Sequence, residues 1–161
     1  MLKTKTKTNL KLRFFLLMLL STIFLSTCSK PDYQIFEGSS GNIENLKGKW
    51  VVVNYWADWC PPCIQEMPEL SAFYNDNKER VTVFAYNFDR LEGEELQQML
   101  IRFKVEVPSI LSDPGELFGW EAPPSLPTTY IVDPQGNMKV MLVGPQTKEK
   151  LEMLIGKYKG S

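Results

Sequence analysis

Two apolar runs predict the centre of a sheet. The first covers residues 50–56 and is interrupted only by Asn54, and the second covers residues 81–88 with few polar positions. Apolar runs of this length are typical of strands that are covered on both faces, as in a parallel or mixed sheet between helices. We therefore expect two buried strands in the core of the protein.

Helical periodicity follows each of these runs. Ile64, Met67 and Leu70 recur every three residues after a pair of prolines, which suit the first turn of a helix, and this predicts a helix over residues 62–75. Apolar residues at i, i+3, i+4 and i+7 predict an amphipathic helix over residues 93–103. The other predicted elements are a short strand at residues 109–111, a helical turn at 114–119, strands at 128–132 and 138–143 joined by a turn at 133–137, and a last helix around 151–158.

The order of these elements predicts an α/β fold. Two strand-helix units followed by a hairpin and a final helix imply a central mixed β-sheet flanked by helices. The length of 161 residues allows one such domain and a short appendage, which the sequence places at the N-terminus.

The first residues have the pattern of a secretory signal. Residues 1–13 are basic and contain no acid, and residues 14–25 are apolar apart from two hydroxyl side chains. The apolar stretch is shorter than the roughly 20 residues that a membrane-spanning helix needs. We therefore expect the domain on the extracytoplasmic side, with a retained, marginal anchor as the alternative to cleavage.

The next residues resemble the lipobox of bacterial lipoproteins. Residues 25–28 read Leu-Ser-Thr-Cys, and Thr27 stands where lipoboxes usually carry Gly, Ala or Ser. In that family the cysteine is acylated and becomes the first residue. The resemblance implies a lipoprotein-type signal peptide at residues 1–27 and a lipid on Cys28 that tethers the protein to a membrane. Ordinary cleavage nearby, which leaves Cys28 as a free thiol, is the alternative.

Composition excludes several classes of function. Lys and Arg number 18 and Asp and Glu 19, for a formal net charge of -1, but five of the basic residues lie within residues 1–13, which contain no acid. The rest of the chain is therefore acidic and unsuited to binding nucleic acid. The absence of histidine excludes Ser-His-Asp and Cys-His catalysis and His-ligated zinc.

Cys60 and Cys63 are the strongest candidates for chemistry. Two prolines separate them at the point where a predicted buried strand passes into a helix, which is the context of a redox-active CxxC motif. The start of a helix stabilises an anion and lowers the pKa of the Cys60 thiol, and the thiolate attacks disulfides. One helical turn brings Cys63 within reach of the same sulfur. We expect Cys60 to be the exposed nucleophile and Cys63 the resolving thiol.

Other uses of this cysteine pair have less support. A stabilising disulfide gains little from closing so short a loop, and a structural zinc ion needs four ligands, which the chain does not supply. We expect no metal and no organic cofactor, because the dithiol itself carries the electrons. Cu(I) binding by two thiolates and a role as a lipoprotein assembly module remain open. If Cys28 carries lipid, the three cysteines leave Cys60 and Cys63 as a pair.

Three motifs resemble the thioredoxin-like reductases of the TlpA and ResA type. They are WADWCPPC at residues 56–63, EMPEL at 66–70 and SLPTTYIVDPQG at 125–136. The resemblance covers about residues 33–158 and implies a thioredoxin-like fold. Members of this family are usually tethered outside the cytoplasm, reduce protein disulfides, often those of apocytochrome c, and receive electrons from a membrane protein. A disulfide oxidase on the same fold is the alternative direction.

The resemblance also implies a proton carrier. Glu66 matches a buried glutamate that transfers protons during disulfide exchange, and burial raises the pKa of a carboxyl group. Asn54 supports this role, because cytoplasmic thioredoxins carry a buried aspartate at the matching strand position and this chain does not.

The expected client-binding residues flank the cysteines. The Leu126–Pro127 bond matches the cis-proline of the family, which presents its backbone to an extended client segment. Trp59 and Pro61 stand beside the nucleophile and are expected to contact the client.

These patterns divide the chain into three parts. They are a signal peptide at residues 1–27, a tether that ends in a short strand at 28–45, and a thioredoxin-like domain at 46–161. The expected partners are disulfide-containing client proteins, a membrane electron donor and the membrane itself through the lipid.

Overall fold

The computed structural model describes residues 30–159. Contacts group the described residues from Pro31 onward into one compact unit, and the predicted signal peptide and Cys28 lie outside the described residues. None of the helices in the described part of the chain combines the length and the apolar character needed to cross a membrane. The elements, in order, are η1 (Ile43–Leu46), β1 (Trp50–Trp56), α2 (Pro61–Asn77), β2 (Val81–Asn87), α3 (Gly93–Phe103), α4 (Pro114–Phe118), β3 (Thr128–Val132), β4 (Met138–Val143) and α5 (Lys148–Lys159).

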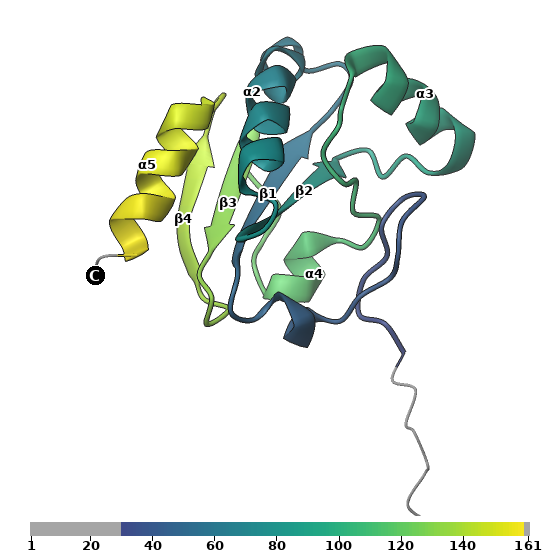
Figure 1. The fold of residues 1–161 in the computed structure, drawn as a ribbon. Coiled ribbons are helices and arrows are strands. Elements are labelled where there is room, and N and C mark those ends of the chain that lie inside the picture. The colour runs from purple at the N-terminus through teal and green to yellow at the C-terminus, as the bar shows by residue number, and fades with distance from the viewer. Residues whose placement is uncertain (1–29, 160–161) are drawn as a thin grey trace, which may run out of the picture. The chain divides into compact units, whose positions relative to one another are not determined.

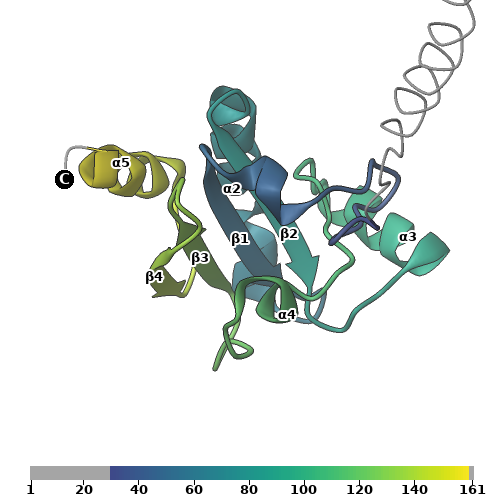
Figure 2. The same ribbon diagram turned by 90° about the horizontal axis from the view of Figure 1, so that it is seen from below.

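The four strands form one mixed sheet, as the element order predicts. The strand order is β2-β1-β3-β4, with β1 parallel to β2 and antiparallel to β3, and with β3 and β4 forming an antiparallel hairpin. In Figures 1 and 2, α5 lies beside β4 and α3 lies at the opposite, β2 side. The predicted α/β fold, a thioredoxin-like mixed sheet flanked by helices, is confirmed.

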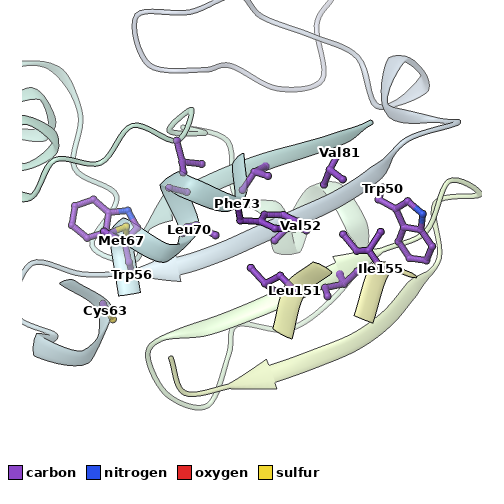
Figure 3. Packing of buried hydrophobic residues seen from close by; sticks show 14 of the residues in the cluster. Trp50, Val52, Trp56, Cys63, Met67, Leu70, Phe73, Val81, Leu151 and Ile155 are labelled. Carbon is purple, nitrogen blue, oxygen red and sulfur yellow. The ribbon is translucent and has the colours of Figure 1, made fainter. Parts of the chain in front are cut away.

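Strand β1 is the centre of the core because both of its faces are covered. Every residue of β1 is buried, which agrees with its apolar run. Trp50 and Val52 belong to the cluster formed with α2 and α5, where Figure 3 shows Val52 near Phe73 and Trp50 near Ile155. The alternate residues of the strand pack in a second cluster on the other face of the sheet. Asn54 shares the face of Val52, so its amide lies under α2 in an apolar layer.

A turn built on Asp133 fixes the β3–β4 hairpin. Its carboxylate accepts hydrogen bonds from the backbone N–H groups of Gln135 (3.0 Å) and Asn137 (2.8 Å) and pairs with Lys139 at 2.9 Å. These partners overcome the effect of burial and lower the pKa of Asp133 to about 2. The turn and both strands lie where the sequence predicts them.

The prediction of two further short strands is wrong. Ile35, in the predicted tether strand, pairs with Ile110 as an isolated bridge, and Ser109 pairs with Ala85 in the same way. The chain turns at Glu37, which has a φ of 50°, so the pairing started at Ile35 cannot continue. The apolar side chains in these segments cover the edge of the sheet without extending it.

Candidate active site

Three loops meet at one edge of the sheet, beyond the ends of β1 and β2. These strands are parallel and end together, since Trp56 pairs with Asn87. Strand β3 is antiparallel to β1 and begins at this edge, where Thr128 pairs with Tyr55. The loop that leaves β1 ends at Cys60, the N-cap of α2, and therefore lies beside the loops at residues 88–92 and 125–127.

The two cysteines form a disulfide at the start of α2. Their sulfurs lie 2.05 Å apart and their Cα atoms 5.3 Å apart. Pro61 and Pro62 occupy the first positions of the helix and have no N–H group. The first N–H group of the helix therefore belongs to Cys63, and it donates to the Cys60 sulfur at 3.3 Å. In the reduced protein this N–H and the helix dipole stabilise negative charge on Cys60.

Cys60 is less accessible than the sequence predicts. Its exposed fraction is 4%, so the prediction of an exposed nucleophile is wrong for this oxidised state. Cys60 belongs to the same core cluster as Trp56 and Ala57, and its sulfur is bonded to that of Cys63. Cys63 has an exposed fraction of 0%, so Cys60 remains the only one of the pair that a client can reach.

The segment before β3 has the predicted cis bond between Leu126 and Pro127. Pro127 is buried, Leu126 is half-buried, and the Pro127 carbonyl accepts from the Gly144 N–H at 2.9 Å. The Thr128 hydroxyl donates to the Ser125 carbonyl at 2.8 Å. These bonds tie the segment to both sides of the hairpin and fix its position at the active-site edge.

Glu66 is buried one helical turn after Cys63. Its exposed fraction is 3%, and its carboxylate accepts from Asn54 Nδ2 at 2.6 Å and from the Gln146 backbone N–H at 2.8 Å. Burial raises the pKa of Glu66 to about 7, although both hydrogen bonds act to lower it. A carboxyl group with this pKa can both bind and release a proton near neutral pH, which suits general acid-base chemistry.

Two partners in this polar network, Thr129 and Gln146, are not among the residues that the sequence analysis selects. Asn54 Nδ2 also donates to Thr129 Oγ1 at 3.0 Å, across the β1–β3 pair, while Asn54 Oδ1 has no partner among the described residues. Thr129 could be found from its position two residues after Pro127. Gln146 binds Glu66 through its backbone, which any residue but proline provides, so no sequence signal marks it.

Trp59 extends from the active-site edge into solvent. The exposed fraction of Trp59 is 60%, and its indole Nε1 donates to Asp89 Oδ2 at 2.7 Å. Pro61 is exposed beside it. The structure therefore brings all of the predicted client-binding residues to one edge and adds Asp89, which the sequence analysis does not select.

The described residues contain no cluster of three or more Cys, Asp or Glu side chains that could hold a metal ion. The polar groups near the two cysteines are instead a carboxyl group, amides and hydroxyls in direct hydrogen bonds. A carboxyl group held in this way can bind and release a proton during exchange between sulfur atoms.

Known proteins with related sequences and structures agree with this chemistry. The model of the AhpC/TSA family matches residues 30–141. The thioredoxin-like protein YneN of Bacillus subtilis is 32% identical over 126 residues, which cover 76% of this chain and 74% of that protein. The thiol-disulfide oxidoreductase ResA of Bacillus cereus is 31% identical over 125 residues, 76% of this chain and 72% of ResA.

A solved structure extends the agreement to three dimensions. The crystal structure of StoA from Bacillus subtilis superposes with a TM-score of 0.63 and 25% sequence identity, covering 78% of this chain and 98% of StoA. The chain belongs to the AhpC/TSA family and is a thioredoxin-like thiol-disulfide oxidoreductase of the ResA type.

Proposed function

We propose that this protein is a membrane-tethered reductase of disulfides in exported client proteins. The observation that carries the proposal is the position of Cys60 at the start of α2, with the cis bond before Pro127 at the same edge and the carboxyl group of Glu66 one turn along the helix. Its clients would be disulfide-containing proteins outside the cytoplasm, and apocytochrome c is the client that the resemblance to the TlpA and ResA type suggests.

Two exchange steps complete the proposed reaction. The Cys60 thiolate attacks one sulfur of the client disulfide, forms a mixed disulfide and releases the other client sulfur as a thiolate. The Cys63 thiolate then attacks Cys60 Sγ, which forms the Cys60–Cys63 disulfide and releases the second client thiolate. Two electrons pass to the client, and a membrane electron donor returns the protein to the dithiol.

Glu66 and the client-binding residues have separate roles in these steps. Glu66 accepts the proton of the Cys63 thiol and later returns it to a leaving thiolate, since its pKa lies near neutrality. The backbone of Leu126 and Pro127 docks the extended client segment, and the side chains of Trp59 and Pro61 contact it.

The reduction potential of the Cys60–Cys63 pair tests the direction of the reaction. A reductase is expected to have a potential close to that of thioredoxin, about -270 mV, and an oxidase one close to about -120 mV. Equilibration of the purified domain with glutathione buffers, followed by quantification of free thiols, measures this value. A potential above about -180 mV would contradict the proposed direction and favour the oxidase.

The proposed tether predicts a lipid on Cys28. The full chain, expressed in a bacterial host with labelled fatty acid, is expected to incorporate label and to sediment with membranes. The Cys28→Ser variant is expected to lose both properties, because its hydroxyl is not a substrate for lipobox acylation. Equal incorporation of label by the two chains would overturn the assignment of Cys28, and absence of label from both would overturn the lipid tether.

A further inference from the structure

The edge of the sheet opposite the two cysteines is rich in basic residues. Strands β1 and β2 begin there, since Trp50 pairs with Val81, and the β3–β4 turn joins them through a hydrogen bond from the Gly48 N–H to the Pro134 carbonyl at 2.9 Å. The ring of Trp50 stacks on that of Tyr158, near the end of α5, at 6.0 Å. We call this surface the basic edge, and it consists of residues 44–50, 78–81, 133–139 and 157–158.

The basic edge carries an excess of cations, although acidic residues outnumber basic ones in the described part of the chain. Its segments contain six basic and three acidic residues. Two of the acids are paired with bases, Glu44 with Lys47 at 2.7 Å and Asp133 with Lys139 at 2.9 Å. The remaining acid is Glu79. The remaining cations are those of Lys49, Lys78, Arg80 and Lys157.

None of these four cations forms an ion pair with another described residue. Arg80 donates from Nε (3.0 Å) and Nη2 (2.6 Å) to the Asn77 amide oxygen, which does not neutralise its charge. Lys157 lies over the Tyr158 ring at 6.0 Å. Lys49 and Arg80 line a cavity of about 720 Å³ at this edge, together with Tyr158. The basic edge therefore offers uncompensated positive charge around a hollow that has room for a small anionic group.

The active-site edge has the opposite charge. Its loops at residues 57–60 and 88–92 contain three acids and one base, Arg90, which is paired with Asp113 at 2.7 Å. Strand β1 has 7 residues, so at about 3.3 Å per residue it separates the two edges by about 20 Å. This separation exceeds the screening length of about 10 Å at 0.1 M salt. The acids of the active-site edge therefore do not cancel the attraction between the basic edge and an anionic surface.

The compact unit also begins beside the basic edge. Asp32 accepts a hydrogen bond from the backbone N–H of Ile43, the first residue of η1, at 2.9 Å, and η1 leads into the basic edge. In Figure 1 the purple segment that starts at Pro31 and the β3–β4 turn both lie at the lower side of the molecule. Cys28 precedes Asp32 by four residues, which span at most about 14 Å. A lipid on Cys28 would therefore hold this part of the molecule close to the membrane surface.

We propose that the basic edge binds the anionic phospholipid head groups of the membrane that holds the tether, and that the active-site edge consequently faces away from the membrane, toward clients. The proximity of the membrane rests on the lipid of the proposed function, whereas the charge argument stands without it. Each Lys or Arg close to an anionic membrane strengthens binding about fivefold. Four cations against one acid therefore give a weak, reversible contact, which the tether makes persistent.

Sedimentation of residues 30–161 with lipid vesicles tests this contact. This segment contains every described element and both core clusters, and it omits Cys28 and the basic residues of the signal peptide. It is expected to bind vesicles made of equal parts of phosphatidylglycerol and phosphatidylcholine, and not to bind vesicles of phosphatidylcholine alone. The double variant Lys49→Gln, Lys78→Gln is expected to bind the mixed vesicles at least about tenfold more weakly, because it loses two uncompensated cations.

The matched control is the double variant Arg102→Gln, Lys104→Gln, which also removes two exposed cations. These residues flank Phe103, whose ring contacts that of Trp56, at the far end of β1, at 6.3 Å. The control is expected to bind the mixed vesicles within about twofold of the unmodified segment, because its charges lie beyond the screening length from the basic edge.

The accessibility of the reduced Cys60 thiol tests the proposed orientation. A maleimide that carries a long polyethylene glycol chain is expected to modify Cys60 at the same rate in the free and the vesicle-bound segment, because the active-site edge faces the solution. Protection of this thiol on vesicle binding would overturn the orientation.

The outcomes separate the basic edge from the proposed function. If the segment binds neither kind of vesicle, or if both double variants lose binding to the same extent, the inference is overturned, while the reductase and its lipid tether stand. If inorganic phosphate displaces the segment from vesicles and sodium chloride of equal ionic strength does not, the cavity is a site for the free anion, and the inference is also overturned. If the full chain neither reduces insulin nor acquires lipid, the proposed function fails, but binding of residues 30–161 to the mixed vesicles still supports the basic edge.

Discussion

Replacement of Cys60 by serine is expected to abolish disulfide reduction, and replacement of Cys63 by serine to stop the reaction at a covalent complex with the client. A serine hydroxyl does not ionise at neutral pH, so Cys60→Ser cannot attack a disulfide. Cys63→Ser retains the nucleophile and its helix N-cap position, but lacks the thiol that resolves the mixed disulfide. Insulin reduction measures turnover, and non-reducing electrophoresis detects the trapped complex.

Cys28→Ser is the matched control for this pair, since it replaces the third cysteine of the chain. In detergent solution it is expected to reduce insulin as fast as the unmodified full chain. If Cys60→Ser were to form the trapped complex and Cys63→Ser were not, the assignment of nucleophile and resolving thiol would be reversed. The exposed fractions, 4% for Cys60 and 0% for Cys63, argue against that reversal.

Replacement of Glu66 by glutamine is expected to remove a pH dependence from the stability of the oxidised protein. The pKa of Glu66 is raised from 4.5 to about 7 by burial, so between these values the unfolded chain has lost a proton that the folded protein keeps. The free energy of unfolding therefore falls as the pH rises. Above pH 7 the contribution of Glu66 is about 3 kcal/mol less favourable than below pH 4.5. Below pH 4.5 both states are protonated and the loss disappears.

Urea unfolding of both proteins at pH 4.5, 6 and 8 measures this difference. Glu66→Gln is expected to gain stability relative to the unmodified protein as the pH rises, since the other carboxyl groups are common to both. Asn54→Ala removes an N–H group that stabilises the Glu66 carboxylate at 2.6 Å, so it is expected to raise the pKa further and extend the fall to higher pH. Parallel stability curves for the unmodified protein and Glu66→Gln would contradict the raised pKa.

Hydrophobic patterns predict the central elements well because those elements are buried in a regular way. Residues 50–56 and 93–103 have the bounds that periodicity gives them, and the hairpin has the predicted turn at Asp133. The segments around Ile35 and Ser109 are also apolar, but they cover an edge of the sheet through single bridges. Local sequence cannot distinguish this irregular packing from a short strand.

The sequence predicts the positions of some active-site residues but not all of the contacts between them. Sequence spacing places Cys60, Cys63 and Glu66 on one helix, where fixed geometry relates them. Asp89 and Gln146 reach the site from distant parts of the chain, through one side-chain oxygen and one backbone N–H. Such contacts depend on how the elements pack, and no local pattern encodes them.

The docking of α5 has a consequence for the acid-base chemistry of the protein. The backbone N–H groups of Gln146, which precedes this helix, and of Lys148, its first residue, donate to Glu66 (2.8 Å) and Glu69 (3.0 Å) of α2. The segment that starts at Gln146 is thus in direct contact with the buried carboxylate of Glu66. A truncation before Gln146 would expose the Glu66 carboxyl group to water and return its pKa toward the ordinary range. The segment that starts at Gln146 would therefore control proton transfer by Glu66, although it contributes no reactive atom.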